Sequence, residues 1–239
     1  MNRLKVSIVS VIILLMAGCT DYIMICSLNP FYVDKNITLI SGIEGNWKAV
    51  PLKGKSVSGK EEKSPSWYQK DTTSTWVIER VITKETIKTA KGKDSAVNKP
   101  SNYYMVKLIS KQSDTAAYQF KLVLFRVKNA LYADFMPVSN TCMEKSRFAY
   151  ESYFSVHTLA RVVIQNKQVE VSWLGAEYMK EMIEKKRVRV SYRWIDSAKR
   201  LLLTGTPEEL TGMIERYAGE TRFIDWGNQQ AMLMLNRIK

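Results

Sequence analysis

The feature that most constrains the fold is a set of short segments in which apolar and polar residues alternate. In segment 118–127, one face carries Tyr118, Phe120, Leu122 and Leu124, and this period of two is typical of a strand buried on one side. Similar strand signals occur at 43–50, 76–82, 103–109, 131–136, 162–164, 169–173, 188–194 and 201–203. Many short strands with few helical stretches between them predict an antiparallel sheet.

The connections between these strands differ in length. Gln165-Asn166-Lys167 is short enough to join its two flanking strands as a hairpin. Segments 51–75 and 90–101 are rich in polar residues and predict two longer loops, and Pro137 is expected to end the strand before it. In segment 188–194 the alternation places arginines on one face, which predicts a half-buried strand with a basic outer face.

Two helices are predicted, both in the C-terminal half of the chain. In TPEELTGMIERYAG, Thr206 and Glu209 have the spacing of a capping box, and Pro207 suits the first helical position. The apolar stripe of this helix consists of Leu210, Met213, Ile214 and Tyr217. The second helix is expected over 176–186, with a buried stripe made by Met179, Met182 and Ile183. These elements predict an α+β fold built on an antiparallel, curved sheet or a partly open barrel.

The first eighteen residues have the three parts of a secretory signal peptide. Arg3 and Lys5 precede an apolar run at 6–17, and small residues follow it. That run is shorter than the roughly 20 residues of a membrane-spanning helix. No later segment of the sequence is apolar for about 18 residues, the minimum for such a helix.

Leu15-Met16-Ala17-Gly18-Cys19 resembles the lipobox of bacterial lipoproteins, with Met16 where that pattern usually has Leu. The resemblance implies that Cys19 becomes the first residue of the mature protein and carries fatty chains on its thiol and on its amino group. Several acyl chains hold a protein on a bilayer far more firmly than a single chain does. A simple signal peptide with an incidental cysteine, and an uncleaved anchor, are the alternatives.

These features divide the chain into three parts. We expect a signal peptide at 1–18, a lipidated tether at 19–35 and a single α+β soluble domain at 36–239. The second mature residue is Thr20 rather than Asp, which resembles the enterobacterial sorting pattern for the outer membrane. The predicted location is therefore the bacterial cell envelope, lipid-anchored at the outer membrane.

The chain is strongly basic, with a formal charge of +13 over 239 residues. Because the signal peptide holds Arg3 and Lys5 and no acidic residue, the part from Cys19 onward keeps +11. This charge either favours anionic lipid headgroups or serves solubility through scattered lysines. Basic residues gather at 187–200 around Tyr192 and Trp194. In an envelope protein, lipid phosphates or a solvated face explain them better than nucleic acid.

Two longer segments resemble a broad group of uncharacterised bacterial envelope lipoproteins. SLNPFYVDKNITLISGIEGNWK (27–48) contains the Pro-x-Tyr and Gly-x-Trp of that group, and LLLTGTPEELTGMIERYAGE (201–220) is similar to its closing strand and helix. Gly45-Asn46-Trp47 also resembles the Gly-x-Trp that opens the first strand of lipocalins and related barrels, in which the tryptophan closes one end. This resemblance implies a calycin-like barrel, partly open because a helix is predicted before strand 188–194.

Residues for catalysis or metal binding are sparse. His157 is the only histidine, which excludes HExxH and most zinc sites, and we expect it to be structural. The carboxylates that a glycosidase would need to bring together are Asp134, Glu144, Glu151 and Glu170, and their spacing alone pairs none of them. Cys26 and Cys142 either form a disulfide or stay free, and they fit no redox or zinc motif.

Together these observations predict a non-catalytic envelope lipoprotein that is held on the lipid bilayer by acylated Cys19. No catalytic residue, metal or cofactor is predicted. The folded domain is expected to bind a small apolar ligand or another envelope component, and not nucleic acid. The alternative is a hydrolase or glycan-processing enzyme of an unrecognised type, which needs a cleft with convergent carboxylates.

Overall fold

The fold is taken from a computed structural model of the chain, which describes residues 25–50, 75–88, 94–109, 116–140, 156–195, 201–218 and 232–238. The predicted signal peptide, Cys19, Cys142, Glu144 and Glu151 lie outside these residues. What the sequence predicts for them therefore stays a prediction. Within the described ranges, no helix has the length and apolar character that crossing a membrane requires.

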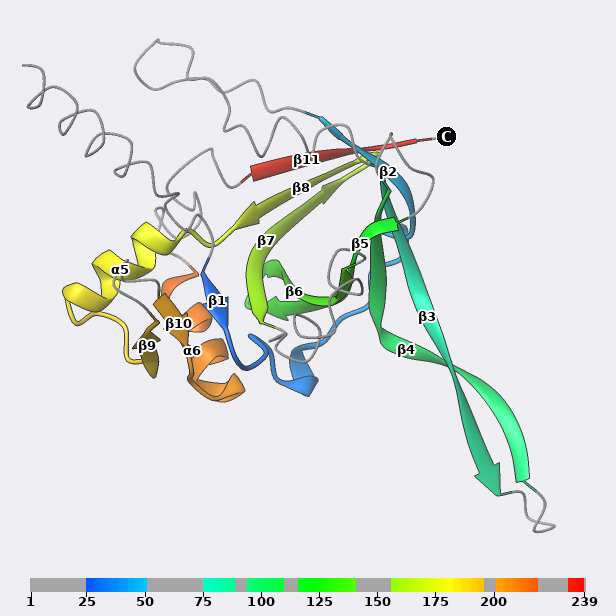
Figure 1. Cartoon of the computed structure of the whole chain (residues 1–239), viewed down its shortest axis with the longest axis horizontal. Helices are drawn as coiled ribbons and strands as arrows, with labels where there is room; N and C mark the ends of the chain where they lie inside the picture. The colour runs from blue at the N-terminus through cyan, green and yellow to red at the C-terminus, as the bar shows by residue number, and fades with distance from the viewer. Residues whose placement is uncertain are drawn as a thin grey trace, which may run out of the picture.

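Eight antiparallel strands close into a barrel (Figure 1). They are β2 (Gly45–Val50), β3 (Thr75–Lys88), β4 (Asp94–Ile109), β5 (Ala116–Val127), β6 (Ala130–Asn140), β7 (His157–Gln165), β8 (Gln168–Trp173) and β11 (Met232–Arg237). They pair in the order β6-β5-β4-β3-β2-β11-β8-β7, and β6 pairs with β7 to complete the ring. The prediction of a curved, antiparallel, calycin-like sheet is confirmed, but the barrel is closed where a partly open one was predicted, because β6 pairs with β7.

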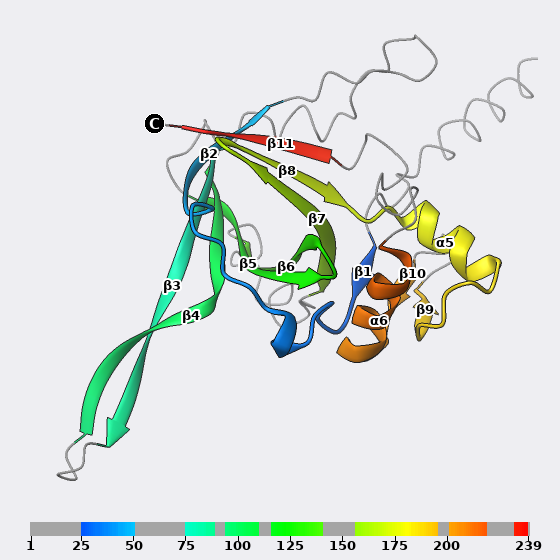
Figure 2. The same ribbon diagram turned by 180° about the vertical axis from the view of Figure 1, so that it is seen from behind.

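The remaining elements form a small annex on one side of the barrel (Figure 2). It comprises β1 (Cys26–Ser27), α5 (Ala176–Glu184), β9 (Tyr192–Trp194), β10 (Leu201–Leu203) and α6 (Pro207–Tyr217), while the 3-10 helix η1 (Asp34–Asn36) follows β1 in the chain. β1 pairs with both β7 and β10, and β10 pairs with β9. The chain thus leaves the barrel after β8, builds the annex and returns as β11, so the two helices do not interrupt the ring.

Residues 25–35, predicted as part of a tether, belong to the folded body. Ile25 and Phe31 are buried, and the Ile25 N–H donates to the Leu174 carbonyl oxygen at 3.0 Å. Burying a side chain of this kind contributes roughly 1.5–3 kcal/mol, which favours order in a short segment. The tether prediction is wrong for these residues, and the folded body begins no later than Ile25.

The predicted strand 188–194 is shorter in the structure. Only Tyr192–Trp194 forms β9, and Tyr192 and Trp194 are 38% and 41% exposed although Val190 is buried. β9 is the last strand of the sheet, and among the described residues it pairs only with β10. Its side chains therefore extend beyond the edge of the core instead of lying inside it.

Two features that the sequence assigns to loops or strand ends are part of the sheet. β3 and β4 continue past the barrel as a two-stranded ribbon, here called the arm (82–88 and 94–100), so the predicted loop at 90–101 is wrong for 94–101. Pro137 does not end its strand, because β6 continues to Asn140 through a register shift opposite Gln119 and Phe120. A bulge tolerates the missing proline N–H.

Both predicted helices are confirmed. At the start of α6, the Glu209 N–H donates to Thr206 Oγ1 at 3.3 Å, and the Thr206 N–H donates to the Glu209 carboxylate at 3.0 Å. This reciprocal pair is the predicted capping box. Helix α5 buries Met179, Met182 and Ile183, as the sequence predicts.

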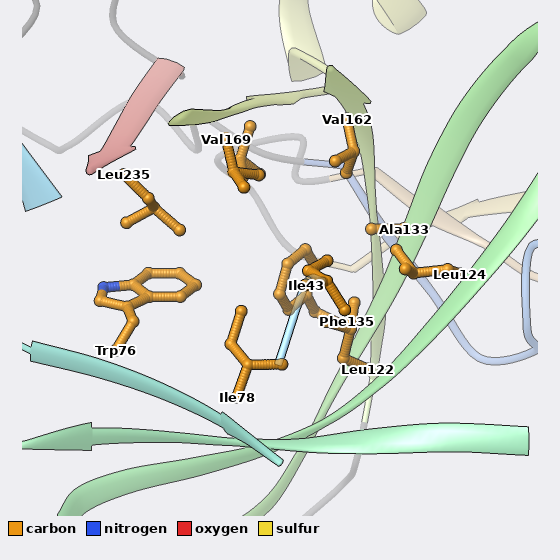
Figure 3. A pocket seen from close by; sticks show the side chains of 11 residues that line it. Ile43, Trp76, Ile78, Leu122, Leu124, Ala133, Phe135, Val162, Val169 and Leu235 are labelled. Carbon is orange, nitrogen blue, oxygen red and sulfur yellow. The ribbon is translucent and has the colours of Figure 1, made fainter. Parts of the chain in front are cut away.

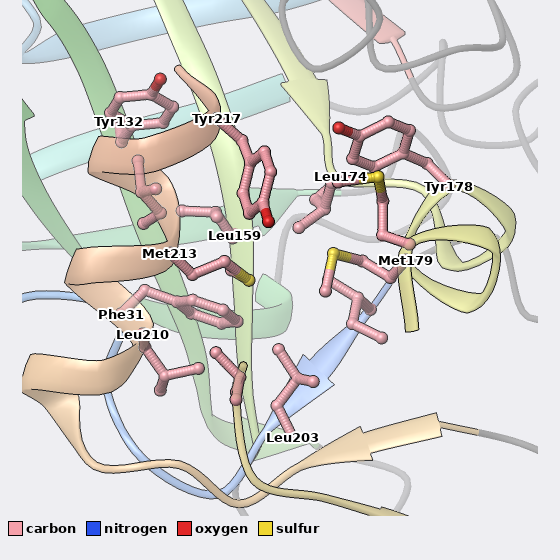
Figure 4. Close-up of a cluster of buried hydrophobic side chains, with 14 of the residues drawn as sticks. Phe31, Tyr132, Leu159, Leu174, Tyr178, Met179, Leu203, Leu210, Met213 and Tyr217 are labelled. Atoms are coloured by element: carbon pink, nitrogen blue, oxygen red, sulfur yellow. The ribbon is translucent and has the colours of Figure 1, made fainter. Parts of the chain in front are cut away.

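Two clusters of buried side chains hold the molecule together. The barrel core fills the ring and includes Trp47, Tyr104 and Phe135. The annex core lies between the outer face of the barrel wall and the annex, and includes Phe31, Leu159, Met179 and Leu210 (Figure 4). The wall formed by β5, β6 and β7 therefore has an apolar face on each side.

Candidate functional site

The barrel interior is the first candidate for a ligand site, because an eight-stranded barrel holds either side chains or one small ligand. Its lining consists of Ile43, Trp76, Ile78, Leu122, Leu124, Ala133, Phe135, Val162, Val169, Val171 and Leu235 (Figure 3). The cavity between them measures about 10 Å³, which is about the space of one water molecule. Small-molecule pockets typically measure roughly 300–1,000 Å³. As far as the described residues define it, the interior is a packed core.

The Gly45-Asn46-Trp47 motif lies at one end of the barrel. Trp47 is fully buried, and its Nε1 donates to the Ile43 carbonyl oxygen at 2.8 Å. The Arg237 guanidinium lies 5.4 Å from the centroid of the Trp47 ring. Gly45 has a φ of 129°, and a Cβ there would meet Arg237 Nη2 at 3.0 Å. The glycine therefore makes room for the arginine that covers the tryptophan.

The segment between η1 and β2 fills the same end. The Thr38 N–H donates to the Leu124 carbonyl oxygen at 2.9 Å, and the Ile40 N–H donates to Tyr104 Oη at 3.0 Å. Ile43 then turns inward and lines the interior (Figure 3). This end of the barrel is thus closed by the chain itself.

A buried carboxylate joins the barrel to the annex. Asp134 is 1% exposed, and its Oδ1 lies 2.7 Å from His157 Nδ1. Asp134 Oδ2 accepts the Phe31 N–H at 2.8 Å, and Thr211 Oγ1 of α6 donates to the Phe31 carbonyl oxygen at 3.2 Å. We call Asp134, His157 and the Phe31 backbone the polar latch. The lone histidine is therefore a partnered structural residue, as the sequence predicts.

Ser27, His157 and Asp134 bring the residue types of a hydrolytic triad to one place. Ser27 pairs with His157 across β1 and β7. However, Ser27 Oγ donates to the Leu203 carbonyl oxygen at 3.4 Å and accepts the Asn29 N–H at 3.2 Å. A nucleophile needs a hydrogen bond to its base and access to a substrate, whereas Ser27 is 0% exposed. The three residues serve packing and pairing, not hydrolysis.

Tyr32 lies beside the polar latch, with its ring centroid 5.8 Å from that of Phe125. Burial, and then the charges of Asp134 and Asp34, raise the pKa of Tyr32 to about 12. The phenol therefore stays neutral near pH 7. It contributes packing rather than a charge at that pH.

The other candidate acids and cysteines are not brought together. Glu170 lies on β8, two strands from Asp134, and accepts a hydrogen bond from Ser172 Oγ at 3.5 Å. Cys26 carries a free thiol whose pKa is raised by burial, and its possible partner Cys142 lies outside the described residues. Within the described ranges, no three His, Cys, Asp or Glu residues form a group able to hold a metal ion.

The arm is the most prominent projection of the sheet (Figure 1). β2 pairs with β3 only as far as Ile78, and β5 pairs with β4 only from Tyr104 onward. Among the described residues, both outer edges of the arm therefore lack a partner strand. Ile82 and Val97 on the arm are 65% and 41% exposed. No sequence pattern marks this surface, because its polar composition resembles that of a loop.

Comparison with known proteins adds no relative to this description. No protein-family model, no curated protein and no solved structure matches the chain. What the protein does is therefore inferred from its own residues and geometry.

Proposed function

We propose that this protein is a non-catalytic, lipid-anchored component of the bacterial envelope that binds another envelope protein through the arm. The observation that carries the proposal is the arm, a two-stranded ribbon with both outer edges open among the described residues. Such a hairpin alone is marginally stable in water, and an open strand edge is a template for pairing with another chain. The arm is therefore suited to a protein partner.

The side chains of the arm give this contact selectivity. Lys84 and Glu85 are exposed, and Lys99 Nζ lies 3.1 Å from the Glu85 carboxylate. Charges on an open edge prevent pairing with arbitrary chains. A partner that offers complementary charges and pockets for Ile82 and Val97 is favoured over an unselected one.

The anchor is supported by Cys19 and its place in the chain. The lipobox resemblance implies acylation of this residue, and Ile25, where the folded body begins, lies six positions later. An extended chain spans at most about 3.3–3.6 Å per residue, so the body is held within about 20 Å of the acylated residue. An anchored protein with so short a tether meets its partners at the membrane surface.

The packed barrel argues against the alternative of an apolar ligand. Its interior of about 10 Å³ is far smaller than a fatty acid, and the chain itself closes one end. No observation favours the hydrolase alternative, since both Asp134 carboxylate oxygens are occupied in the polar latch. These features support binding of a partner protein through an outer surface of the molecule.

The anchor is tested by growing cells that produce the protein with a clickable fatty-acid probe. We expect label on the native chain, none on Cys19→Ala, and release of the Cys19→Ala protein from the membrane fraction. Cys26→Ala is the matched control and should keep its label. Unlabelled native protein, or label that follows Cys26, would contradict the proposed anchor.

The arm contact is tested by photo-crosslinking in cells. A photoreactive amino acid at Val97 on the arm should give a discrete protein adduct, and one at the exposed Glu184 at the end of α5 should not. Replacing 83–99 by an Asn-Gly turn keeps the Ile82–Pro100 pair and should release the partner from co-purification. Identical adducts at both positions, or an unchanged partner after shortening, would count against the arm.

A further inference from the structure

We propose that one exposed side of the annex docks on an anionic lipid bilayer. This side, the annex edge, consists of Tyr192, Trp194, Ile195, Arg189 and Arg193. The proposal rests on the lipid anchor proposed above and deepens it. It assigns the face that the anchored body turns toward the membrane.

The annex edge presents apolar and aromatic side chains to solvent. Tyr192, Trp194 and Ile195 are 38%, 41% and 53% exposed, and the two rings pack edge to face with centroids 5.9 Å apart. Trp194 pairs with Leu201 and Tyr192 pairs with Leu203, and both leucines are buried. Paired residues on antiparallel strands share a face. Tyr192 and Trp194 therefore lie on the same face as the buried leucines, and the apolar surface of the annex core extends to solvent at these two side chains.

The segment that forms the annex edge is basic, although Glu184 precedes it and Asp196 follows it in the sequence. Segment 185–195 contains five basic residues and no acidic one, namely Lys185, Lys186, Arg187, Arg189 and Arg193. Lys185 pairs with Glu181 of α5 at 2.6 Å, whereas Arg189 and Arg193 are exposed. Arg193 pairs with Leu202 and therefore lies on the face of β9 opposite the aromatic pair, but β9 is the outermost strand of the sheet, so both of its faces border the annex edge. Trp and Tyr concentrate at membrane–water interfaces, and clustered basic residues are attracted to anionic headgroups. The chemistry of the annex edge thus fits an anionic leaflet better than a neutral one.

The short length of chain between Cys19 and Ile25 allows this edge to reach the membrane. β9 lies two strands from β1 in the annex sheet, and strands are about 4.8 Å apart, so the annex edge is about 10 Å from the start of the folded body. An acylated Cys19 lies at most about 20 Å away along an extended chain. Figures 1 and 2 show the arm on the opposite side of the barrel from the annex, so docking through the annex points the arm away from the bilayer.

The proposal is tested with the chain from residue 20 onward, which lacks the acylated cysteine and contains every described residue. It is mixed with phosphatidylcholine vesicles, with or without phosphatidylglycerol, and vesicle-bound protein is measured by flotation. We expect binding to the vesicles that contain phosphatidylglycerol, weakened by added salt. Tyr192→Ser with Trp194→Ser should lower the bound fraction by about fivefold or more. The double change Arg189→Gln with Arg193→Gln should remove the preference for phosphatidylglycerol.

Ile82→Ser is the matched control, because Ile82 is an exposed apolar residue on the arm, and it should bind like the parent chain. The unfolding midpoint of each variant shows whether it is folded. If the variant with both aromatic residues replaced does not fold, the variant with both arginines replaced still tests the proposal. Absent binding, equal binding to neutral vesicles, or an equal loss with Ile82→Ser would overturn the proposal. A change in sedimentation mass instead of vesicle binding would also overturn it, because the edge would then join two copies.

The lipid anchor is tested separately, by measuring the mass of the intact native protein. A native chain without acyl mass refutes the anchor whatever the vesicles show. An acylated native chain whose annex-edge variants bind vesicles normally refutes the docking face alone.

Discussion

The barrel core and the annex core reach a similar degree of burial by different routes. Apart from Ile43, every residue of the barrel core lies on a strand and is followed or preceded at two positions by another core residue. The annex core instead collects Ile25, Phe31, residues of both helices and of the short strand β10, and the outer face of the barrel wall. One core follows from a repeating local pattern, and the other from contacts between distant parts of the chain.

This difference shows where the polar latch matters. The barrel core is surrounded by continuous strand pairing, so its side chains are held by the ladder on every side. The annex packs on the barrel through the annex core, and its hydrogen bonds to the barrel include those of two-residue β1 and of Asp134. We therefore expect the stability of the annex to depend on these few polar contacts in addition to its packing.

The largest effect is expected in the barrel core, for Trp47→Ala. Emptying this fully buried site should lower the free energy of unfolding by about 3–5 kcal/mol, and Arg237 loses the ring it covers. Trp194→Ala is the matched control at the exposed annex edge and should change stability by about 0.5 kcal/mol or less. Urea unfolding of both variants measures the difference, and equal losses would contradict the assignment of the two sites.

The polar latch is tested by Asp134→Ala. It leaves the Phe31 N–H and the His157 ring without their acceptor, so we expect a loss of about 1–3 kcal/mol. Hydrogen exchange should show the loss mainly in α6 and β1, with the barrel strands less affected. A double-mutant cycle with His157→Gln should give a coupling energy of at least about 0.5 kcal/mol. Additive effects, or uniform loss of protection across the barrel, would argue against a latch.

A smaller effect is expected at the capping box of α6. Thr206→Ala removes the acceptor for the Glu209 N–H and should cost about 1 kcal/mol. Ser191→Ala, at an exposed position of the annex, should change the unfolding free energy by about 0.5 kcal/mol or less. If the two variants unfold alike, the cap does not support the annex.

The last effect is a pH dependence at Tyr32, which is confined to alkaline pH. Its pKa is raised from 10.0 to about 12 in the folded protein, so the folded state holds its proton more tightly than the unfolded state does. This contribution to stability is complete below pH 10 and is lost as the pH rises through about 12. Tyr32→Phe should therefore lose less stability than the parent chain between about pH 9 and about pH 11. Parallel losses in urea titrations would show that Tyr32 ionises normally.

The contrast between the cores also explains how much the sequence predicts. Segment 118–127 predicts β5, the hairpin at Gln165-Asn166-Lys167 joins β7 to β8, and TPEELTGMIERYAG predicts α6 with its cap. Each of these three features is determined by residues that lie close together in the sequence, within one strand, one hairpin or one helix. The ring closure by β6 and β7 follows from no local pattern, because it needs the register of Leu131 against Val162.

The residues that the sequence misplaces are those whose surroundings are distant in the chain. The sequence predicts a tether at Ile25 and Phe31 because no residue near them in the sequence indicates the annex core in which they are buried. Pro137 reads as a strand end because the bulge that accommodates it depends on the facing strand. The aromatic residues of β9 read as buried because alternation cannot show that a strand is the last one of its sheet.

The candidate site divides in the same way. Gly45-Asn46-Trp47 indicates its barrel position directly, whereas the covering Arg237 lies at the other end of the chain and has no local signal. The second strand of the arm, 94–100, is predicted as a loop because a ribbon exposed on both faces has the polar composition of a loop. Cys19 is predicted from sequence alone, since the chain around it lies outside the described residues.

The proposal that the protein acts through its outer surfaces depends on the barrel being filled by its own side chains. Protein purified from native membranes is extracted with organic solvent, and the extract is weighed against the protein by quantitative mass spectrometry. We predict that no apolar molecule is recovered in stoichiometric amount, while the acyl chains remain covalently on the protein. One equivalent of a non-covalent lipid, lost when Leu124→Trp narrows the interior of a folded variant, would contradict the account.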